Sequence, residues 1–265
     1  MISTEDFTQA FEKLRPQLRS FLLRMTARVE DADDIVQDTY LKAHQHLSSF
    51  RGGSSLKTWV FTIASNLCRD LLRAQKRWPE NVTDICREAA LSSPEFLGQM
   101  MQIRHTSPQG DFEIREHITF CFTCIGKSLP IEQQLVLLLK EVYEFKAQEI
   151  AEILGRTENQ VKHFLHDARQ KMIDIFERRC ALVSKTGACH QCSELNGIFN
   201  PKHELQKELM KIEMAREAGT KSKEELFDLR LKIVQSLDPF TSAAAELQLR
   251  HLAHNKSVMD KHLEK

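Results

Sequence analysis

Apolar side chains recur at intervals of three and four residues along much of the chain, which is the spacing of amphipathic helices. The first stripe predicts a helix near the N-terminus and consists of Phe7, Phe11, Leu14, Leu18, Phe21 and Met25. Acidic residues at 30–34 then mark the start of a second helix, since negative charge favours a helix N-terminus. Its buried positions are expected to be Val36, Tyr40, Ala43 and Leu47, and its outward positions Asp34, Gln37, Asp38 and Lys42.

A glycine- and serine-rich loop at residues 50–55 precedes a third predicted helix over residues 56–77. The expected core face of this helix consists of Leu56, Trp59, Ile63, Leu67 and Leu71. Residues 51–77 carry the clearest local cluster of basic side chains: Arg51, Lys57, Arg69, Arg73, Lys76 and Arg77. The cluster is either a solvated basic face or a surface for nucleic acid, and the residues alone leave both interpretations open.

The second half of the chain contains a pattern typical of a helix-turn-helix. Helical periodicity fades over residues 78–111, which we interpret as a linker with short helical pieces. Leu129–Pro130 marks a helix start, because proline fits the first turn of a helix. Further along, Gly155 predicts a turn, and Thr157 with Gln160 predicts a capping box for the helix that follows.

Composition narrows the class of protein. The 265 residues include only nine glycines and seven prolines, which favours long helices, and the formal net charge is zero. Any nucleic-acid surface must therefore be a local patch. The polar N-terminus lacks the pattern of a signal peptide and no apolar run could span a membrane, so we expect a cytoplasmic protein with no membrane partner.

The predicted elements have distinct binding chemistry. In a helix-turn-helix the second helix presents polar residues to base edges and phosphates, here Asn159, Gln160, Lys162, His163, His166 and Arg169. The basic helix can hold unstacked bases and neutralise phosphates. The acidic helix repels DNA and suits a basic protein partner. The alternative for each is a solvated polar helix face.

Taken in order, three stretches resemble the small bacterial RNA polymerase sigma factors called extracytoplasmic-function (ECF) sigma factors. The first, residues 31–42, is similar to the family's polymerase-binding motif. The second combines Phe50-Arg51-Gly52 with residues 56–67 and is similar to the segment that opens and reads the minus-ten promoter element. The third, residues 129–169, is similar to the domain that reads the minus-thirty-five element.

The resemblance implies roles for individual residues. It implies that Asp34, Gln37 and Asp38 bind core RNA polymerase, and that the linker lies near the RNA exit path of the polymerase. It implies that promoter DNA at the minus-ten element is bound by Phe50, Arg51, Lys57, Phe61, Asn66, Arg69 and Arg73. An anti-sigma factor is a further candidate partner, and no catalytic residue is expected because the polymerase performs the chemistry.

The sequence departs from the family pattern at three positions. His44 stands where tryptophan is usual, and Phe164 and Asp167 stand where the recognition helix often has arginine. An aspartate near phosphate weakens DNA binding, so this departure predicts a lower affinity of the helix for promoter DNA.

Cysteine and histidine residues distinguish the C-terminal extension. Cys180, Cys189, Cys192 and His203 are a candidate zinc-binding set, with His190 as an alternative fourth ligand. A redox-active dithiol and reduced cysteines in a small core are the competing interpretations. Cys121 and Cys124 lie in an apolar helical stretch and are expected to fill a core.

The sequence therefore predicts an all-α protein of two small helical domains with a helical extension. The expected segments are residues 1–77, a linker at 78–111, a helix-turn-helix domain at 112–179 and an extension at 180–265. The predicted function is that of an alternative sigma factor, and its extension is a candidate regulator. The rival functions are a helix-turn-helix regulator that acts without polymerase and, less supported by the residues, an enzyme with a Cys/His active site.

Overall fold

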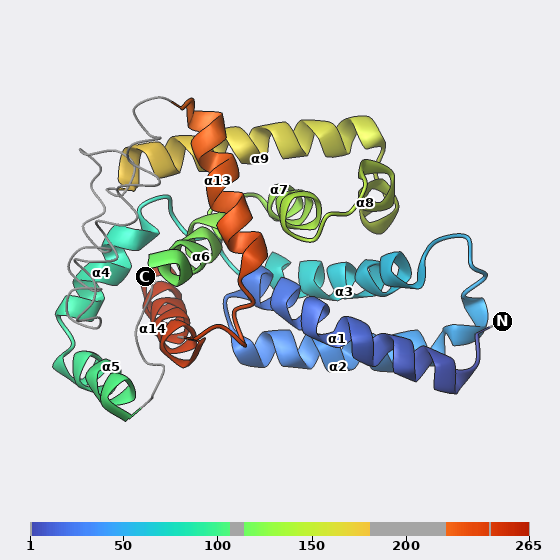
Figure 1. Ribbon diagram of the computed structural model, residues 1–265, viewed down its shortest axis with the longest axis horizontal. Helices are drawn as coiled ribbons and strands as arrows, with labels where there is room; N and C mark the ends of the chain where they lie inside the picture. The colour runs from blue at the N-terminus through green and yellow to red at the C-terminus, as the bar shows by residue number, and fades with distance from the viewer. Residues whose placement is uncertain (1, 107–113, 181–220, 244, 265) are drawn as a thin grey trace. The chain divides into compact units, whose positions relative to one another are not determined.

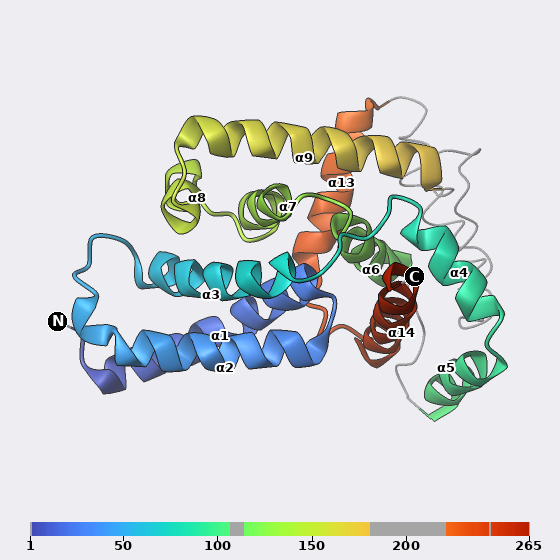
Figure 2. The same ribbon diagram turned by 180° about the vertical axis from the view of Figure 1, so that it is seen from behind.

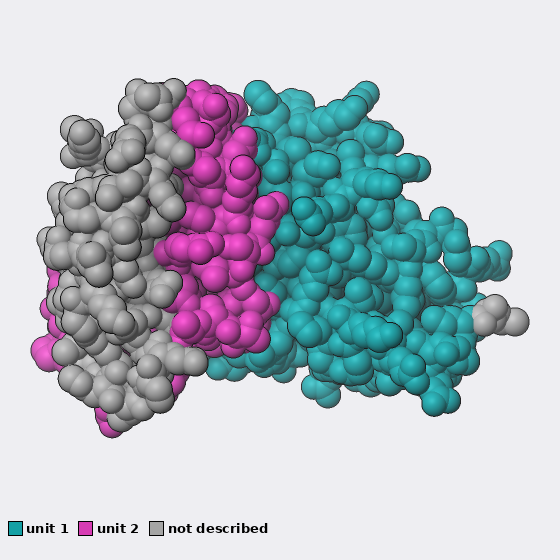
Figure 3. All heavy atoms as spheres, viewed as in Figure 1, with its two compact units in different colours: residues 1–77, 129–169 teal, residues 78–128, 170–265 magenta. Residues whose placement is uncertain are grey.

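The computed structural model describes residues 2–106, 114–180, 221–243 and 245–264. Within these ranges all the elements are helices, as Figures 1 and 2 show, which confirms the expected all-α class. The chain forms two compact units, coloured teal and magenta in Figure 3. Unit 1 comprises Met1–Arg77 and Leu129–Arg169, and unit 2 comprises Trp78–Ser128 and Gln170–Lys265.

The N-terminal part of unit 1 contains α1 (Thr4–Thr26), α2 (Val29–Gln45), the short 3-10 helix η1 (Leu47–Ser49) and α3 (Leu56–Arg73). Local side-chain chemistry sets where these helices begin and end. Ser3 Oγ accepts a hydrogen bond from the Asp6 amide at 3.1 Å, and Ser55 Oγ accepts one from the Thr58 amide at 3.0 Å. Helix α1 ends where Ala27 takes a left-handed conformation, with φ of 59°.

Most of the predicted stripe on α1 is buried. Phe7, Phe11, Leu18, Phe21 and Met25 have no exposed surface, whereas Leu14 is partly exposed. Tyr40 of α2 packs on this stripe, with its ring centroid 5.8 Å from Phe7 and 5.1 Å from Phe11. On α2, the predicted buried positions Val36 and Ala43 are confirmed, whereas Tyr40 and Leu47 are partly exposed.

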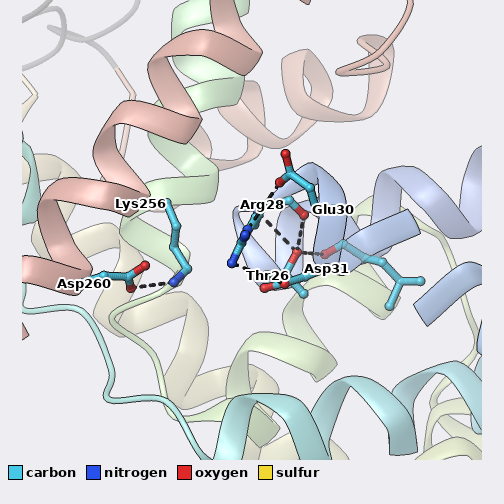
Figure 4. A network of polar contacts seen from close by, with 7 residues as sticks. Thr26, Arg28, Glu30, Asp31, Lys256 and Asp260 are labelled. Carbon is cyan, nitrogen blue, oxygen red and sulfur yellow. Dashed lines mark hydrogen bonds and ion pairs between the residues drawn. The ribbon is translucent and has the colours of Figure 1, made fainter. Parts of the chain in front are cut away.

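Ion pairs hold the start of α2 in place. Arg19 of α1 binds Asp33 through two hydrogen bonds of 2.5 and 2.9 Å. At the turn between the helices, Arg28 pairs with Glu30 at 3.3 Å and with Asp31 at 3.9 Å, as Figure 4 shows. Some residues of the acidic stretch therefore form ion pairs that stabilise the fold.

The predicted core face of α3 is wrong in register. The buried apolar side chains are Val60, Phe61, Ala64, Cys68 and Leu72. Leu56, Trp59, Ile63, Leu67 and Leu71, which were expected in the core, are partly exposed. Helix α3 packs against α1 and α2 and also against α7 (Ile131–Leu137) and α8 (Ala147–Leu154) in the second half of unit 1. Its buried face therefore covers a wider arc than one stripe.

The second half of unit 1 contains α7 (Ile131–Leu137), the π-helical turn η2 (Leu138–Val142), α8 (Ala147–Leu154) and the first part of α9 (Glu158–Arg179). The expected start after Leu129–Pro130 and the expected turn are both confirmed. Gly155 ends α8 with a φ of 62°. The Thr157 amide donates to Gln160 Oε1 at 3.0 Å, and Thr157 Oγ1 accepts from the Gln160 amide at 3.3 Å.

Unit 2 combines the predicted linker with the C-terminal extension. Its described helices are α4 (Val82–Leu91), α5 (Pro94–Thr106), α6 (Ile114–Gly126), the last part of α9, α13 (Lys223–Ser236) and α14 (Ala245–Leu263). Their core contains three stacked or tilted phenylalanine rings from α6, α9 and α13, with Phe122, Phe176 and Phe227 about equally spaced at 6.3 to 6.4 Å. The pieces expected to form a linker are therefore packed helices.

Polar contacts complete unit 2. Glu80 forms ion pairs with Lys171 at 2.7 Å and Arg178 at 3.1 Å, which tie the end of α9 to the segment before α4. On α14, Lys256 pairs with Asp260 at 2.5 Å (Figure 4). Among the described residues, none of the helices has the length and apolar character needed to cross a membrane.

Phe227 gives a direct test of this packing. We expect Phe227→Ala to destabilise unit 2 by about 3–5 kcal/mol, because the side chain is fully buried and its removal leaves a cavity. Hydrogen exchange of α4, α6 and α13 in the full chain should accelerate. Leu91→Ala removes an exposed side chain from the same unit and should leave exchange nearly unchanged. Equal protection in the two variants would show that α13 does not hold unit 2 together.

Candidate nucleic-acid interface

An exposed polar face runs along α2. Asp34, Gln37 and Asp38 are all exposed, as the sequence predicted. They lie opposite the buried side of the helix, which consists of Ala32, Ile35, Val36, Thr39 and Ala43. Since residues three and four apart share one face of a helix, these three side chains form a single surface.

The same surface contains an apolar residue that sequence reasoning missed. Leu41 is 47% exposed, which is unusual for a large apolar side chain in this protein. It lies three residues after Asp38 and four after Gln37, and so continues the same face. Its position on the helical wheel was a usable signal, because Leu41 falls outside the predicted buried stripe. The face thus offers carboxylates for a basic partner and one apolar anchor.

The loop before α3 is held by aromatic contact. The Phe50 ring lies 5.1 Å from the Trp59 ring, and Trp59 lies 6.4 Å from Phe7. Phe50 and Trp59 are both partly exposed, and Arg51 is exposed. The preceding helix ends near His44, which is exposed with its ring 5.9 Å from Tyr40.

The residues that the sequence assigns to the minus-ten element fall into two groups on α3. Asn66 and Arg73 are exposed, with Arg73 Nη1 3.1 Å from Asp70. Lys57, Phe61 and Arg69 instead contact the second half of unit 1. In this second group Lys57 and Arg69 are only partly exposed and Phe61 is buried, whereas Asn66 and Arg73 are exposed.

The turn between η2 and α8 packs against Lys57 and Phe61. Lys57 Nζ lies 4.4 Å from the centre of the Phe145 ring and donates to the Tyr143 carbonyl at 3.5 Å. Burial lowers the pKa of Lys57, and the neighbouring carboxylates of Glu149 and Glu144 partly oppose that shift. Phe61 has no exposed surface, and its ring lies 4.8 Å from that of Phe145.

Arg69 lies in a second contact, which joins α3 to Leu129–Arg169. We call Leu129–Arg169 the helix-turn-helix segment. Its Nε is 3.6 Å from Glu132 Oε1, and only 12% of the Arg69 side chain is exposed. Arg156 shares the same carboxylate at 3.7 Å. Two cations from different parts of unit 1 thus meet on Glu132.

The start of α9 presents the expected polar residues. Asn159, Gln160, Lys162, His163 and His166 are all exposed, and Arg169 is partly exposed. Gln160 is used in part by the capping box, and Arg169 Nη1 binds Glu141 Oε1 at 2.8 Å. Of the residues predicted to read bases, Asn159, Lys162 and His166 are exposed and take no part in these two contacts.

One of the two unusual residues of this helix, Asp167, has a structural partner. Asp167 Oδ2 lies 3.1 Å from His163 Nδ1, so the carboxylate has a neighbour that can carry positive charge. Phe164 is partly buried. Pairing with a protonated His163 would weaken the repulsion between Asp167 and phosphate.

The described thiols lie mostly in cores. Cys121 and Cys124 are buried in unit 2, as expected. Burial raises the pKa of the Cys124 thiol to about 12 and also raises that of Cys86, which disfavours the reactive thiolate. Asn255 of α14 contacts both, since it donates from Nδ2 to Cys124 Sγ at 3.6 Å while its carbonyl accepts from Cys86 Sγ at 3.9 Å.

Three of the four candidate zinc ligands, Cys189, Cys192 and His203, lie outside the described residues, as does the alternative ligand His190. Cys180 is partly exposed at the end of α9. Within the part of the chain that the structure describes, no group of three or more His, Cys, Asp or Glu side chains could hold a metal ion. Zinc binding by the extension stays a prediction.

Two protein-family models match the chain: Sigma-70 region 2 over residues 10–77, and Sigma-70, region 4 over residues 121–172. Over 156 residues the chain is 31% identical to the RNA polymerase sigma factor YlaC of Bacillus subtilis (strain 168), which covers 59% of this chain and 83% of the relative. This chain belongs to the ECF RNA polymerase sigma factors. The resemblance inferred from the three sequence stretches is thereby confirmed.

A second relative shows how much of the sigma factor is shared. The ECF RNA polymerase sigma factor SigG of Mycobacterium tuberculosis (strain ATCC 25618 / H37Rv) is 31% identical over 178 residues, which are 63% of this chain. The match spans 48% of SigG, so this chain covers about half the length of that relative. A crystal structure of the sigma factor RpoE in complex with the anti-sigma factor NepR from Bartonella quintana aligns with a TM-score of 0.44 and 21% identity, over 65% of this chain and 97% of that chain.

The family matches differ from the compact units of this sigma factor. The region 2 match ends at residue 77, where the first segment of unit 1 also ends. The region 4 match starts at residue 121 and ends at 172, so its two ends belong to unit 2. Region 4 thus contributes side chains to both cores.

Proposed function

We propose that this chain binds core RNA polymerase and directs it to specific promoters, which it opens at the minus-ten element and reads at the minus-thirty-five element. The observation that carries the proposal is the exposed face of α2, with Asp34, Gln37, Asp38 and Leu41 left free of the helical core. A helix-turn-helix regulator that acts on duplex DNA alone has no need of such a face. In this proposal the chain positions DNA and the polymerase performs the chemistry.

The proposal also assigns a duplex-reading role to α9. Asn159 at the exposed start of the helix is suited to pair with adenine, and Lys162 is suited to reach guanine or phosphate. The capping box and Gly155 fix the direction in which the helix leaves the turn. The residues that we propose to contact the promoter therefore lie on one helix, α9, whose start is fixed by the turn.

Binding to core polymerase tests the proposal. We expect the double variant Asp34→Asn and Asp38→Asn to bind core polymerase at least about tenfold more weakly, because it loses two charges that face a basic partner. The measurement is the affinity of purified full-length chain for core enzyme. Glu30→Gln removes an exposed charge from the start of the same helix and should bind almost normally.

If the double variant binds as tightly as the wild type, the face of α2 is not the polymerase contact. If wild-type chain binds promoter duplex but no core polymerase, the rival function of a stand-alone helix-turn-helix regulator replaces the proposal.

Duplex binding gives a second prediction. Lys162→Ala should weaken promoter binding by the holoenzyme about uniformly across sequences and lower the slope of log affinity against log salt by about 1, because one phosphate contact is lost. Lys13→Ala removes an exposed lysine from α1 and serves as the control. An unchanged salt slope in Lys162→Ala would count against this docking of α9.

We further propose that the extension regulates the sigma factor by holding the linker in a folded state. Helix α4 of the linker and the following helix α6 bury apolar and polar side chains against α13 and α14, with Phe227 on Phe122 and Asn255 between Cys86 and Cys124. On α5, the Phe96 ring stacks on His254 at 3.7 Å. A linker that lies along the RNA exit path of the polymerase would first have to leave these partners.

Transcription by a variant with a loosened extension tests this regulation. Phe227→Ala should raise run-off transcription with core polymerase severalfold, because it shifts the population towards a released linker. Leu91→Ala should match the wild type. Faster hydrogen exchange in α13 without any change in transcription would overturn the proposed regulation while leaving the sigma-factor function in place.

A further inference from the structure

The predicted strand-binding face of α3 has a partner within unit 1. In both views α8 lies beside the first half of α3 (Figures 1 and 2). Phe145 covers Lys57 and Phe61, with the Lys57 amine 4.4 Å and the Phe61 ring centre 4.8 Å from the centre of the Phe145 ring. Thr58 Oγ1 donates to Glu149 Oε1 at 3.4 Å. We call these interactions, together with the Arg69–Glu132 ion pair, the α3–α8 contact.

Carboxylates in this contact face the cations of α3. Glu132 lies 3.6 Å from Arg69, and Glu149 and Glu144 stabilise the charged form of Lys57. Phosphate oxygens of a DNA strand would bind the same cations. The acidic side chains of the helix-turn-helix segment therefore take the position that a DNA backbone would occupy on this face.

Specific hydrogen bonds fix the same segment on α1. Gln134 Nε2 donates to the Arg24 carbonyl at 3.1 Å, and both residues are buried. The Tyr143 hydroxyl donates to Ser20 Oγ at 3.0 Å, and its ring meets Phe21 edge-on at 5.5 Å. These bonds define one register for the segment on α1 and α3, which a loose electrostatic association would lack.

The composition of the covered face argues against a purely structural contact. A permanent core is usually apolar, because burying cations costs desolvation free energy that an ion pair barely offsets. Here α7, α8 and the turn between η2 and α8 cover Lys57, Thr58 and Arg69 as well as Phe61. A face of cations, a hydroxyl and an aromatic ring has the chemistry of a single-stranded DNA site.

We propose that the α3–α8 contact is autoinhibitory: in the chain alone, the helix-turn-helix segment covers the strand-binding face of α3, and single-stranded DNA competes with it. The inference rests on the proposed function, because it takes α3 as the strand-binding helix. It goes further in stating that the two promoter-reading parts cannot act until they separate. Opening the contact frees Lys57 and Arg69 for phosphate and one side of Phe61 for a base.

A pair of nearly isosteric substitutions weakens the contact. The double variant Glu132→Gln and Glu149→Gln removes both opposing charges while each glutamine oxygen still accepts hydrogen bonds, including the bond from the Lys146 amide that begins α8. The control is Glu5→Gln with Glu152→Gln, which removes two exposed charges elsewhere in unit 1. Both variants therefore have the same net charge.

Two measurements on the full chain follow. The first is the acetylation rate of Lys57 by mass spectrometry, with the exposed Lys42 as internal reference. The second is the affinity for a fluorescein-labelled pool of single-stranded DNA of random sequence. We expect the double variant to acetylate Lys57 faster and to bind the pool about tenfold more tightly than the control, because a closed population no longer competes with DNA.

A second variant guards against a change in folding. Tyr143→Phe removes the hydroxyl that binds Ser20 and keeps the ring, so it should shift both measurements in the same direction by a smaller factor. The proposal would be overturned if both variants acetylated Lys57 at the rate of the control and bound single-stranded DNA with the affinity of the control. Faster Lys57 acetylation without tighter DNA binding would show that the contact opens but does not inhibit.

These outcomes are separate from those of the proposed function. The Lys57 measurement needs no polymerase, so it reports the contact even if the chain fails to bind core enzyme. Conversely, wild-type chain that binds core polymerase and starts transcription, with no response to either variant, would leave the sigma-factor function intact and remove the inhibitory contact.

Discussion

An aromatic cluster around Phe61 joins the two halves of unit 1. Phe61 packs on Phe21 at 5.3 Å from one side and on Phe145 at 4.8 Å from the other, and Tyr143 touches both Phe21 and Phe61. Aromatic pairs in such geometries contribute about 0.5–1.5 kcal/mol each beyond the burial of their area. Because one ring belongs to both interfaces, the position of α8 and the accessibility of α3 are set together.

This arrangement explains why the residues of α3 that we propose to face DNA fall into two groups. Asn66 and Arg73 are exposed because they lie on the side of α3 that faces away from its buried residues. Lys57 and Arg69 are neutralised by acidic side chains of the helix-turn-helix segment. The α2 face with Asp34 and Asp38 takes no part in the contact, so the proposed binding of polymerase to α2 does not require α3 to be uncovered.

The sequence predicted elements whose signals are local. Pro130, Gly155 and the Thr157–Gln160 capping box mark helix ends through their own backbone chemistry, and the exposure of Asp34 follows from the period of α2. The core face of α3 could not be predicted in this way. Its register depends on Phe145 and Tyr143, which lie more than 80 residues later in the chain.

Unit 2 was unpredictable for a related reason. The apolar pattern of α5 is weak, and the burial of α4, α5 and α6 becomes clear only when Phe227, His254 and Asn255 of the extension are placed beside them. The polar Asn255 gave no signal, because an asparagine in a helix usually indicates an exposed position. The burial of these helices therefore depends on partners far away in the sequence rather than on local helix propensity.

The central claim is that one face of α3 is used in turn by the helix-turn-helix segment and by promoter DNA. A zero-length carbodiimide cross-link between the Lys57 amine and the Glu149 carboxylate, detected by mass spectrometry, tests it most directly. The account predicts that this link forms in the free chain and is lost in the complex with core polymerase and promoter DNA. A Lys57–Glu149 link that persists in a transcribing complex, or never forms in the free chain, would contradict it.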